Sequence, residues 1–505
     1  MRKILMRILA AIPAVLLQIL WLTVLFKWLA PWAALINLGL SVLAVLFVLY
    51  LITKQGEDTY KILWLLVILP FPVPGAVLYL MFGSKRTTKS LRVKLEKARA
   101  QLAQTLPPAP ECPLPPEAGL RLGQTLNYIE EITGAALCPN LGAEFYPLGD
   151  DLFPDLLAAL EKAERFIFME YFIIERGVFW DSVSEILCRK AAQGVDVRVM
   201  YDDLGSINTY SVKEAWALQQ KGVRMMPFNP LVFVKGTLNF RDHRKMTIID
   251  GRVAFSGGIN LADEYINRVE KHGIWKDFGL RVEGPAVEGY VRLFAEFWDA
   301  FSTEPIPAGL LAPLPPLPAA VPTDGWVLVY GDSPLRNTAA SNELYIELLS
   351  QAERYAWFCS PYLMLGDSLL EAFVRAARRG VDVRIIMPGM PDKKIVFRMS
   401  HSFYPVLLKA GVKIYEYTPG FVHAKGTVID DRVCTVGTVN LDYRSLFLHF
   451  ENNALFCNAS IVQKVKEDIM ATQAQCRTMR LGENVSTGFF HWLLDGVLRI
   501  FSPLC

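Results

Sequence analysis

The stretch His243-Arg-Lys-Met-Thr-Ile-Ile-Asp250 occurs twice in the chain, the second time as His423-Ala-Lys-Gly-Thr-Val-Ile-Asp430. Both copies read His-x-Lys-x-x-x-x-Asp, and both are followed by an asparagine 17 residues after the histidine. The whole chain has 6 histidines, and two of them hold the same position in this pattern. One copy would be a weak signal, because a histidine and a lysine two residues apart are common by chance. Two copies with matched flanks indicate a duplicated functional unit.

The sequence around the two motifs repeats as well. The run Gly-Val-Asp-Val-Arg appears at residues 194–198 and again at residues 380–384. Each half alternates apolar runs of strand length with segments of helical periodicity, which predicts mostly parallel sheets flanked by helices. The repeat is longer than a solenoid unit, so duplication of a whole domain explains it better. We therefore predict an α/β fold with two tandem, pseudo-symmetric domains that share one active site.

Composition divides the chain into five regions. An apolar region, predicted to be in the membrane, covers residues 1–83, and a basic segment followed by a proline-rich linker covers residues 84–116. The first catalytic half is predicted over residues 117–302 and the second over residues 325–505. A second proline-rich stretch, residues 303–324, connects them. Proline-rich composition is typical of stiff linkers.

Three apolar runs, Ile8 to Phe26, Trp28 to Ile52 and Ile62 to Phe82, are each long enough to cross the roughly 30 Å hydrocarbon core of a bilayer. The third run is broken by prolines between residues 70 and 74. Basic residues before the first run and after the third favour a cytoplasmic location for both ends. We predict two N-terminal transmembrane helices and a broken segment that does not cross; three spans with an external N-terminus is the alternative. The protein would then be a multi-pass cell-membrane protein whose catalytic part faces the cytoplasm.

The motif residues suit phosphoryl chemistry. On an extended strand, the histidine and the lysine of each motif point to the same side. Neutral imidazole is a competent nucleophile, and an ammonium group neutralises phosphoryl oxygens. One motif supplies a nucleophile or an acid, whereas two facing motifs supply both. The candidate catalytic residues are His243, Lys245, Asp250, His423, Lys425 and Asp430, with the two aspartates expected on the opposite side of the strand, where they would support its end.

Other residues near the motifs are predicted to assist. Asn260 and Asn440 offer amide donors to a phosphate, and the lack of a side chain at Gly258 lets the backbone approach it. A nucleophilic histidine needs an acceptor for its other ring nitrogen. Asp277 and Glu451, which lie 34 and 28 residues after the histidines of their own halves, are the candidates. No dense cluster of carboxylates, cysteines and histidines suggests a metal site, and the lysines and asparagines supply the charge stabilisation, so we expect neither a metal nor a cofactor.

The paired motifs resemble those of the phospholipase D superfamily, and within it the chain is similar to bacterial cardiolipin synthases. Further stretches that carry the resemblance are residues 239–245, 417–425 and 440–445, the last reading Asn-Leu-Asp-Tyr-Arg-Ser. The similarity runs from about residue 60 to the C-terminus. It implies a membrane-bound enzyme whose partners are phospholipids, with no role for nucleic acid, and it adds Ser445 to the predicted phosphate-binding residues.

The resemblance also implies a reaction in two steps. One phosphatidylglycerol transfers its phosphatidyl group to His243 and releases glycerol, and a second phosphatidylglycerol then attacks the phosphohistidine to give cardiolipin. His423 would act as the general acid and base. The residues alone leave the roles of the two histidines interchangeable, because the motifs are nearly equivalent.

Alternative functions remain at this point. A phospholipase D hydrolase or another phosphatidyltransferase would use the same phosphohistidine, because water and alcohols compete for it. A non-catalytic membrane scaffold is disfavoured, because both motifs are complete. The four other histidines, at positions 272, 401, 449 and 491, are predicted to be structural or interfacial. The apolar C-terminal stretch Phe489 to Phe501 is predicted to pack on the second half, with the bilayer surface as the alternative.

Overall fold

The computed structural model describes most of the chain, namely residues 11–27, 30–53, 57–83, 89–106, 119–230, 239–311, 323–336, 338–483, 485 and 488–504. Most of the first predicted proline-rich stretch and half of the second lie outside these ranges.

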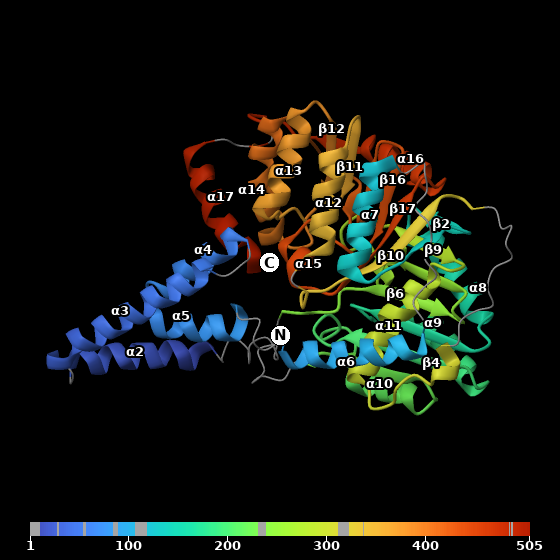
Figure 1. The fold of residues 1–505 in the computed structure, drawn as a ribbon, viewed down its shortest axis with the longest axis horizontal. Helices are drawn as coiled ribbons and strands as arrows, with labels where there is room; N and C mark the ends of the chain where they lie inside the picture. Colours follow the sequence, from blue (N-terminus) through green and yellow to red (C-terminus); the bar gives the residue numbers. More distant parts are fainter. Residues whose placement is uncertain are drawn as a thin grey trace.

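The N-terminal helices form an arm that extends from the rest of the molecule (Figure 1). The arm contains α2 (Ala11–Lys27), α3 (Ala30–Thr53), α4 (Asp58–Ile68), α5 (Pro72–Leu78) and a π-helical turn (Tyr79–Gly83). The third apolar run is interrupted between α4 and α5, where Pro70 cannot donate a helical hydrogen bond. None of the helices within the described ranges has the combined length and apolar character required for a bilayer crossing.

Each half contains one sheet. The first has the strand order β2-β9-β7-β6-β3-β4-β5 and the second the order β1-β10-β17-β16-β15-β11-β12-β13-β18. The strands of the first are β2 (Ala143–Tyr146), β3 (Phe166–Tyr171), β4 (Asp196–Asp202), β5 (Arg224–Phe228), β6 (Lys245–Ile249), β7 (Val253–Gly257) and β9 (Gly279–Glu283). Those of the second are β1 (Leu137–Pro139), β10 (Trp326–Asp332), β11 (Tyr355–Cys359), β12 (Asp382–Pro388), β13 (Lys413–Tyr417), β15 (Gly426–Ile429), β16 (Val433–Gly437), β17 (Glu451–Cys457) and β18 (Cys476–Thr478).

The sheets are mixed, so the prediction of mostly parallel sheets is wrong. Strands β3, β4 and β5 run parallel, as do β11, β12 and β13, and all the other pairings within the two sheets are antiparallel. The parallel strands are joined by helices, whereas each motif strand turns back at once through a tight turn. In the first half that turn begins with Asp250 and Gly251 at φ 54° and 69°, in the left-handed region that suits hairpin turns.

The helices lie in layers around the two sheets. The described helices of the catalytic part are α6 (Lys89–Thr105), α7 (Gly119–Thr133), α8 (Gly149–Glu161), α9 (Val178–Ala192), α10 (Val212–Gln219), α11 (Val287–Phe301), α12 (Ala340–Gln351), α13 (Asp367–Arg378), α14 (Lys394–Ala410), α15 (Tyr443–Phe447), α16 (Ile461–Gln473) and α17 (Phe489–Phe501). Helices α11 and α16 fill the core between the sheets, while α8 and α9 cover the outer face of the first and α12 to α14 that of the second.

One part of the predicted first half packs with the second. Helix α7 contributes Leu122, Leu126 and Ile129 to the core around α12, and strand β1 pairs antiparallel with β10 at the edge of the second sheet. The chain therefore contributes a helix and a strand to the second domain before it forms the first domain. The predicted boundary at residue 117 assigned α7 and β1 to the first half. The sequence of a short amphipathic helix does not reveal which sheet the helix covers.

Backbone hydrogen bonds join the two halves at two equivalent places. Strand β8 (Ile274–Lys276) of the first half pairs in parallel with β14 (Gly420–Val422) of the second. At the second place, Asp242 bridges to Phe450, again in parallel. Each pairing brings the residues in front of one motif against the segment that ends in Asp277 or Glu451 of the other half.

Candidate active site

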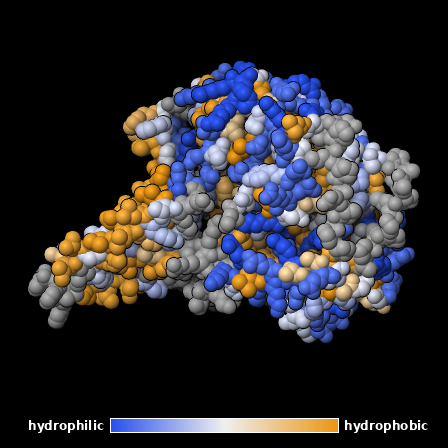
Figure 2. Space-filling model, in the orientation of Figure 1, coloured by the Kyte–Doolittle hydropathy of each residue, from blue (hydrophilic) through white to orange (hydrophobic). Residues whose placement is uncertain are grey.

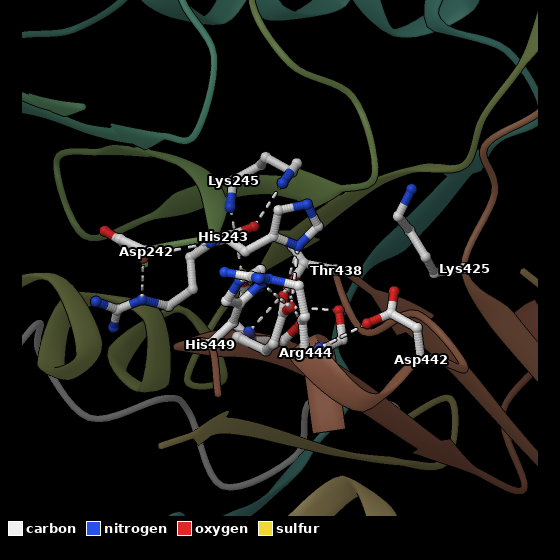
Figure 3. A network of polar contacts seen from close by, with 12 residues as sticks. Asp242, His243, Lys245, Lys425, Thr438, Asp442, Arg444 and His449 are labelled. Carbon is white, nitrogen blue, oxygen red and sulfur yellow. Dashed lines mark hydrogen bonds and ion pairs between the residues drawn. The ribbon is translucent and has the colours of Figure 1, made fainter. Parts of the chain in front are cut away.

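The two His-x-Lys motifs lie at the interface between the halves. His243 precedes β6, which Lys245 opens, and His423 and Lys425 directly precede β15. All four residues are buried, with exposed fractions of 1–7%. The pKa of His243 is lowered by charges from both motifs, including Lys245, Lys425 and His423, so the structure brings the motifs together. Figure 3 shows Lys245 and Lys425 on either side of His243.

The backbone amide of each histidine donates to a carbonyl of the other half. The N–H of His243 donates to Phe450 O at 2.9 Å, and the N–H of His423 donates to Lys276 O at 2.7 Å. The acceptors are equivalent, since each is the residue directly before a carboxylate, Glu451 or Asp277. The pseudo-symmetry of the repeat therefore extends to the way each motif is anchored.

The ring of each histidine is held by the carboxylate of the other half. His243 Nδ1 lies 2.9 Å from Glu451 Oε1, and His423 Nδ1 lies 2.6 Å from Asp277 Oδ2. The expectation that each carboxylate serves the histidine of its own half is wrong. The reason is the reciprocal backbone pairing, which places each carboxylate beside the partner motif. An ionised carboxylate only accepts hydrogen bonds, so each contact favours the tautomer in which Nδ1 carries the proton and Nε2 is free for chemistry.

Glu451 is surrounded by hydrogen-bond donors. The hydroxyl of Ser445 donates to Oε1 at 2.6 Å and that of Thr438 donates to Oε2 at 2.5 Å. Burial raises the pKa of Glu451 to about 8, while the charge of Lys245 and the two hydroxyls act in the opposite direction. The predicted phosphate-binding hydroxyl of Ser445 is thus committed to the carboxylate, and Thr438 is a residue that the sequence analysis missed.

Asp277 has a different environment. Its Oδ1 accepts the backbone N–H of Phe278 at 2.8 Å. A Cβ added at Gly258 would lie 2.0 Å from the same oxygen. Gly258, which we predicted to make room for a phosphate, therefore makes room for this carboxylate. In the repeat, Gly258 occupies the position of Thr438, so the second half has a hydroxyl where the first has a glycine.

The electrostatics of the site favour neutral imidazoles. Burial, followed by the charge of Lys245, places the pKa of His243 well below its usual range. Burial and Lys425 lower the pKa of His423 to about 4, against the opposing effect of Asp277. Burial also lowers the pKa of Lys245 to about 7 and that of Lys425 to about 8. Both lysines donate to the carbonyl oxygen of the histidine in their own motif.

The two motif aspartates face away from the histidines, as expected. Asp250 accepts the backbone N–H groups of Glu164, Arg165 and Phe166 at 2.7–2.8 Å. Asp430 accepts those of the equivalent residues 353–355, also at 2.7–2.8 Å. Each aspartate thus holds the start of the neighbouring strand, β3 or β11. Both were in the candidate catalytic set, and the structure gives them a supporting position instead.

The two asparagines have different surroundings. Asn260 accepts the N–H of Ile173 at 3.1 Å and donates to the hydroxyl of Tyr265 at 2.7 Å. The Tyr265 ring lies 5.4 Å from the ring of His423. Asn440 is buried, and among the described residues its Oδ1 has no hydrogen-bond partner. Asn260 therefore positions an aromatic wall beside His423.

His449 is a third histidine at the site, although the sequence analysis treated it as structural. Its ring lies 5.6 Å from that of His243, and its Nε2 lies 3.2 Å from Arg444 Nε. The ligand atoms of His243, His449 and Glu451 lie within 4.8 Å of one another. Burial, followed by the charges of Arg444 and Lys245, lowers the pKa of His449, and the same positive charges disfavour a cation among these three groups. The sequence feature that could have indicated a site role for His449 is its position two residues before Glu451.

Comparisons with known proteins show which family the chain resembles. Residues 156–277 and 345–472 match the family model described as cardiolipin synthase, PLD-like domain, and residues 39–84 match that described as phospholipase D-nuclease N-terminal. The cardiolipin synthase of Alkalihalophilus pseudofirmus is 34% identical over 92% of this chain and 92% of its own length. That of Geobacillus kaustophilus is 33% identical over 91% and 92%.

The chain belongs to the cardiolipin synthase family. It is a phosphatidyltransferase of the phospholipase D type, in which the two matched segments carry one motif region each. A solved structure, phosphatidylserine synthase of Haemophilus influenzae, has a similar fold, with a TM-score of 0.55 and 14% identity over 75% of this chain and 98% of its own.

Proposed function

We propose that the protein is a membrane-bound cardiolipin synthase that transfers a phosphatidyl group between two phosphatidylglycerol molecules through a phosphohistidine. The observation that carries this proposal is the pair of crossed His–carboxylate contacts, His243 with Glu451 and His423 with Asp277. They give one site two oriented imidazoles, the minimum for attack and for leaving-group protonation. The family relatives named cardiolipin synthase support the choice of a phospholipid substrate.

In the first step, His243 Nε2 attacks phosphorus while Glu451 holds the Nδ1 proton. The new P–N bond forms as the P–O bond to glycerol breaks, and His423 Nε2 delivers its proton to the departing glycerol oxygen. The free enzyme favours neutral His423, but a bound phosphodiester brings a negative charge that favours the imidazolium. Lys245 and Lys425 stabilise the phosphoryl oxygens.

In the second step, the terminal hydroxyl of another phosphatidylglycerol gives its proton to His423 Nε2. Its oxygen forms a P–O bond as the P–N bond breaks, which releases cardiolipin and restores neutral His243 and protonated His423. Aromatic rings enclose the acid–base histidine, with Trp275 and Tyr265 each 5.4 Å from the His423 ring. Such walls favour transfer over hydrolysis, because they limit the access of water to the histidine that would act as its general base.

The proposed membrane anchor is the N-terminal arm, with the catalytic part on the cytoplasmic side. Figure 2 shows that hydrophobic residues dominate its surface. Its helices expose many large apolar side chains, including Leu17, Leu20, Leu38, Leu46, Ile52, Leu66 and Phe71. Large exposed apolar patches mark interaction sites, and a bilayer is the surface from which a phospholipid substrate comes.

The test uses purified full-length protein in vesicles with phosphatidylglycerol labelled in the headgroup and in the acyl chains. The expected products are free glycerol and cardiolipin in equal amounts. Phosphatidic acid as the main labelled lipid would instead establish a hydrolase. A His423→Asn variant, which keeps the size of the side chain and loses its acid–base function, serves as the inactive control.

A further inference from the structure

Helix α17 (Phe489–Phe501) turns polar side chains toward the protein and apolar side chains away from it. Asp495 is the buried residue of this helix, and its carboxylate pairs with Arg398 of α14 at 2.6 Å. Arg499 donates to the carbonyl of Ser402, also in α14, at 2.5 Å. These polar contacts fix the orientation of α17 on the second half. The helix therefore packs on the second half, as predicted, but it does so through polar contacts and the partly buried Leu498 and not through its large apolar side chains.

The outward face of α17 is almost entirely apolar. Its large exposed side chains have exposed fractions of 42–81% and are Phe489, Phe490, Trp492, Leu493, Leu494, Val497 and Phe501. Within α17, all of which the structure describes, none of the exposed side chains is a lysine, arginine, aspartate or glutamate. Each apolar group on this face would gain free energy by leaving water. A face of this kind is expected to be covered.

The surface next to the apolar face of α17 indicates what covers this face. Helix α17 packs beside α4 of the N-terminal arm (Figure 1). Helix α4 exposes Ile62 and Leu66, and the hydrophobic surface of Figure 2 runs from the arm to the region of α17. The two apolar faces thus form one surface that joins the proposed membrane anchor to the catalytic part.

The dimensions and the residues of α17 suit the surface of a bilayer. A helix of 13 residues is about 20 Å long, which is too short to cross a hydrocarbon core of roughly 30 Å. A strongly one-sided apolar helix of this length lies instead in the plane of the interface. Trp492, at the centre of its aromatic N-terminal half, is the residue type favoured at the boundary between headgroups and acyl chains.

We propose that α17 is an interfacial helix that inserts its apolar face into the lipid bilayer beside α4. This inference rests on the proposed membrane attachment and adds a second contact, located on the catalytic part itself. Through the Asp495–Arg398 and Arg499–Ser402 contacts, α17 would hold α14 and the second half at a fixed height above the lipid. The active site would then keep one orientation toward its substrate surface.

Quenching of tryptophan fluorescence by brominated phosphatidylglycerol tests the inference. Full-length protein and a Trp492→Phe variant are reconstituted in vesicles with and without bromine on the acyl chains, and the difference between them gives the signal of Trp492. The matched control is Trp216→Phe: Trp216 on α10 is 58% exposed, against 66% for Trp492, but lies on the far side of the first half. The signal of Trp492 should fall by roughly half or more, because an interfacial helix buries its apolar face about 5–10 Å deep.

The outcomes separate the two proposals. Quenching of the total fluorescence, to which the tryptophans of the arm contribute, reports membrane attachment. If the total signal falls and the Trp492 signal stays unquenched like that of Trp216, then α17 is not in the bilayer and the inference is overturned while the proposed anchor stands. If neither signal falls, the membrane attachment fails as well. Shielding of Trp492 from iodide without bromine quenching would point to a second protein copy and would also overturn the inference.

Discussion

The two halves of the molecule present the same histidine and lysine to one site but support the histidines differently. His243 is held by a glutamate that also accepts hydroxyl groups from Thr438 and Ser445. His423 is held by the shorter Asp277, beside a glycine whose position leaves no room for a side chain. The duplication conserved the fold and the motif, while the residues that set the acceptor strength of each carboxylate diverged.

The walls around the two histidines differ as well. His243 lies next to Phe172 and His449, at ring distances of 5.0 and 5.6 Å. His423 lies among Tyr265, Trp275 and Phe421 at 5.4–6.0 Å. One histidine is therefore set in a polar network and the other among aromatic rings. This comparison shows how two copies of one motif can take on different roles in a single site.

Substitution of the histidines is expected to have the largest effect. His243→Asn and His423→Asn should each reduce cardiolipin formation about 10³- to 10⁴-fold, because each removes a group that acts in both steps. The halves differ in one readout: with labelled phosphatidylglycerol, His423→Asn keeps the nucleophile and should accumulate a labelled protein slowly, whereas His243→Asn should form none. A labelled adduct in His243→Asn alone would reverse the assignment of nucleophile and acid.

Removal of the carboxylates tests the crossed pairing. Glu451→Gln and Asp277→Asn should each lower kcat roughly 10²-fold, because the neutral amide no longer orients Nδ1–H and stabilises an imidazolium less. In double-mutant cycles, His243 should couple with Glu451 and not with Asp277. Strong coupling of His243 with Asp277 would restore the pairing within each half that the sequence suggested.

The pH dependence should reflect the buried lysines. Their pKa values of about 7 for Lys245 and about 8 for Lys425 lie below the usual value, so the ammonium groups that face the phosphate are lost as the pH rises through this range. We expect kcat/KM, which reports the free enzyme, to fall by roughly tenfold per pH unit between about pH 7 and 8, where Lys245 loses its proton, and by up to about 100-fold per unit above pH 8, where both lysines are neutral. A Lys245→Arg variant that retains activity should move the fall to higher pH. An unchanged rate up to pH 9.5 in the wild-type protein would contradict this account.

The glycine position should show a smaller difference between the halves. Gly258→Ala forces Asp277 to shift, because the new Cβ would lie 2.0 Å from its carboxylate oxygen, and should lower kcat about tenfold. Thr438→Ser keeps a hydroxyl for Glu451 and should change kcat less than threefold, on the scale of a weakened hydrogen bond. Circular dichroism controls for the fold of both variants. Equal losses in the two halves would remove the asymmetry proposed for the carboxylates.

The motif aspartates should affect stability more than activity. Asp250→Asn weakens contacts with three backbone N–H groups and should reduce the free energy of unfolding by about 1–3 kcal/mol. Asp430→Asn should behave alike, since its contacts are equivalent. Thermal unfolding and kcat per folded molecule measure the two effects. A large loss of kcat without loss of stability would return these aspartates to the catalytic set.

The sequence predicted the features that depend on local pattern. The repeated His-x-Lys motifs led to two α/β domains with a shared site, and strand periodicity placed Asp250 on the face opposite His243. The sequence did not predict which residues of the two halves contact each other. The spacing along the chain connects each carboxylate to its own half, whereas the exchange of Asp277 and Glu451 depends on contacts between residues far apart in sequence. Tight turns such as Asp250–Gly251 make the motif strands antiparallel to their neighbours. The alternation of helical and strand segments in the sequence does not predict the conformation of such turns.

The crossed contacts also affect the point during synthesis at which the enzyme becomes active. The ribosome completes His243, Lys245 and Asp277 well before it reaches Glu451, so a growing chain holds a nucleophile without its acceptor and an acceptor without its histidine. Docking of the second half then supplies both missing partners in one event. A chain that is released or cut before residue 423 has neither histidine–carboxylate pair, and so no oriented imidazole with which to attack the lipids around it. Exchange of the carboxylates thus serves as an interlock during biosynthesis, by which activity begins only when the whole polypeptide is present.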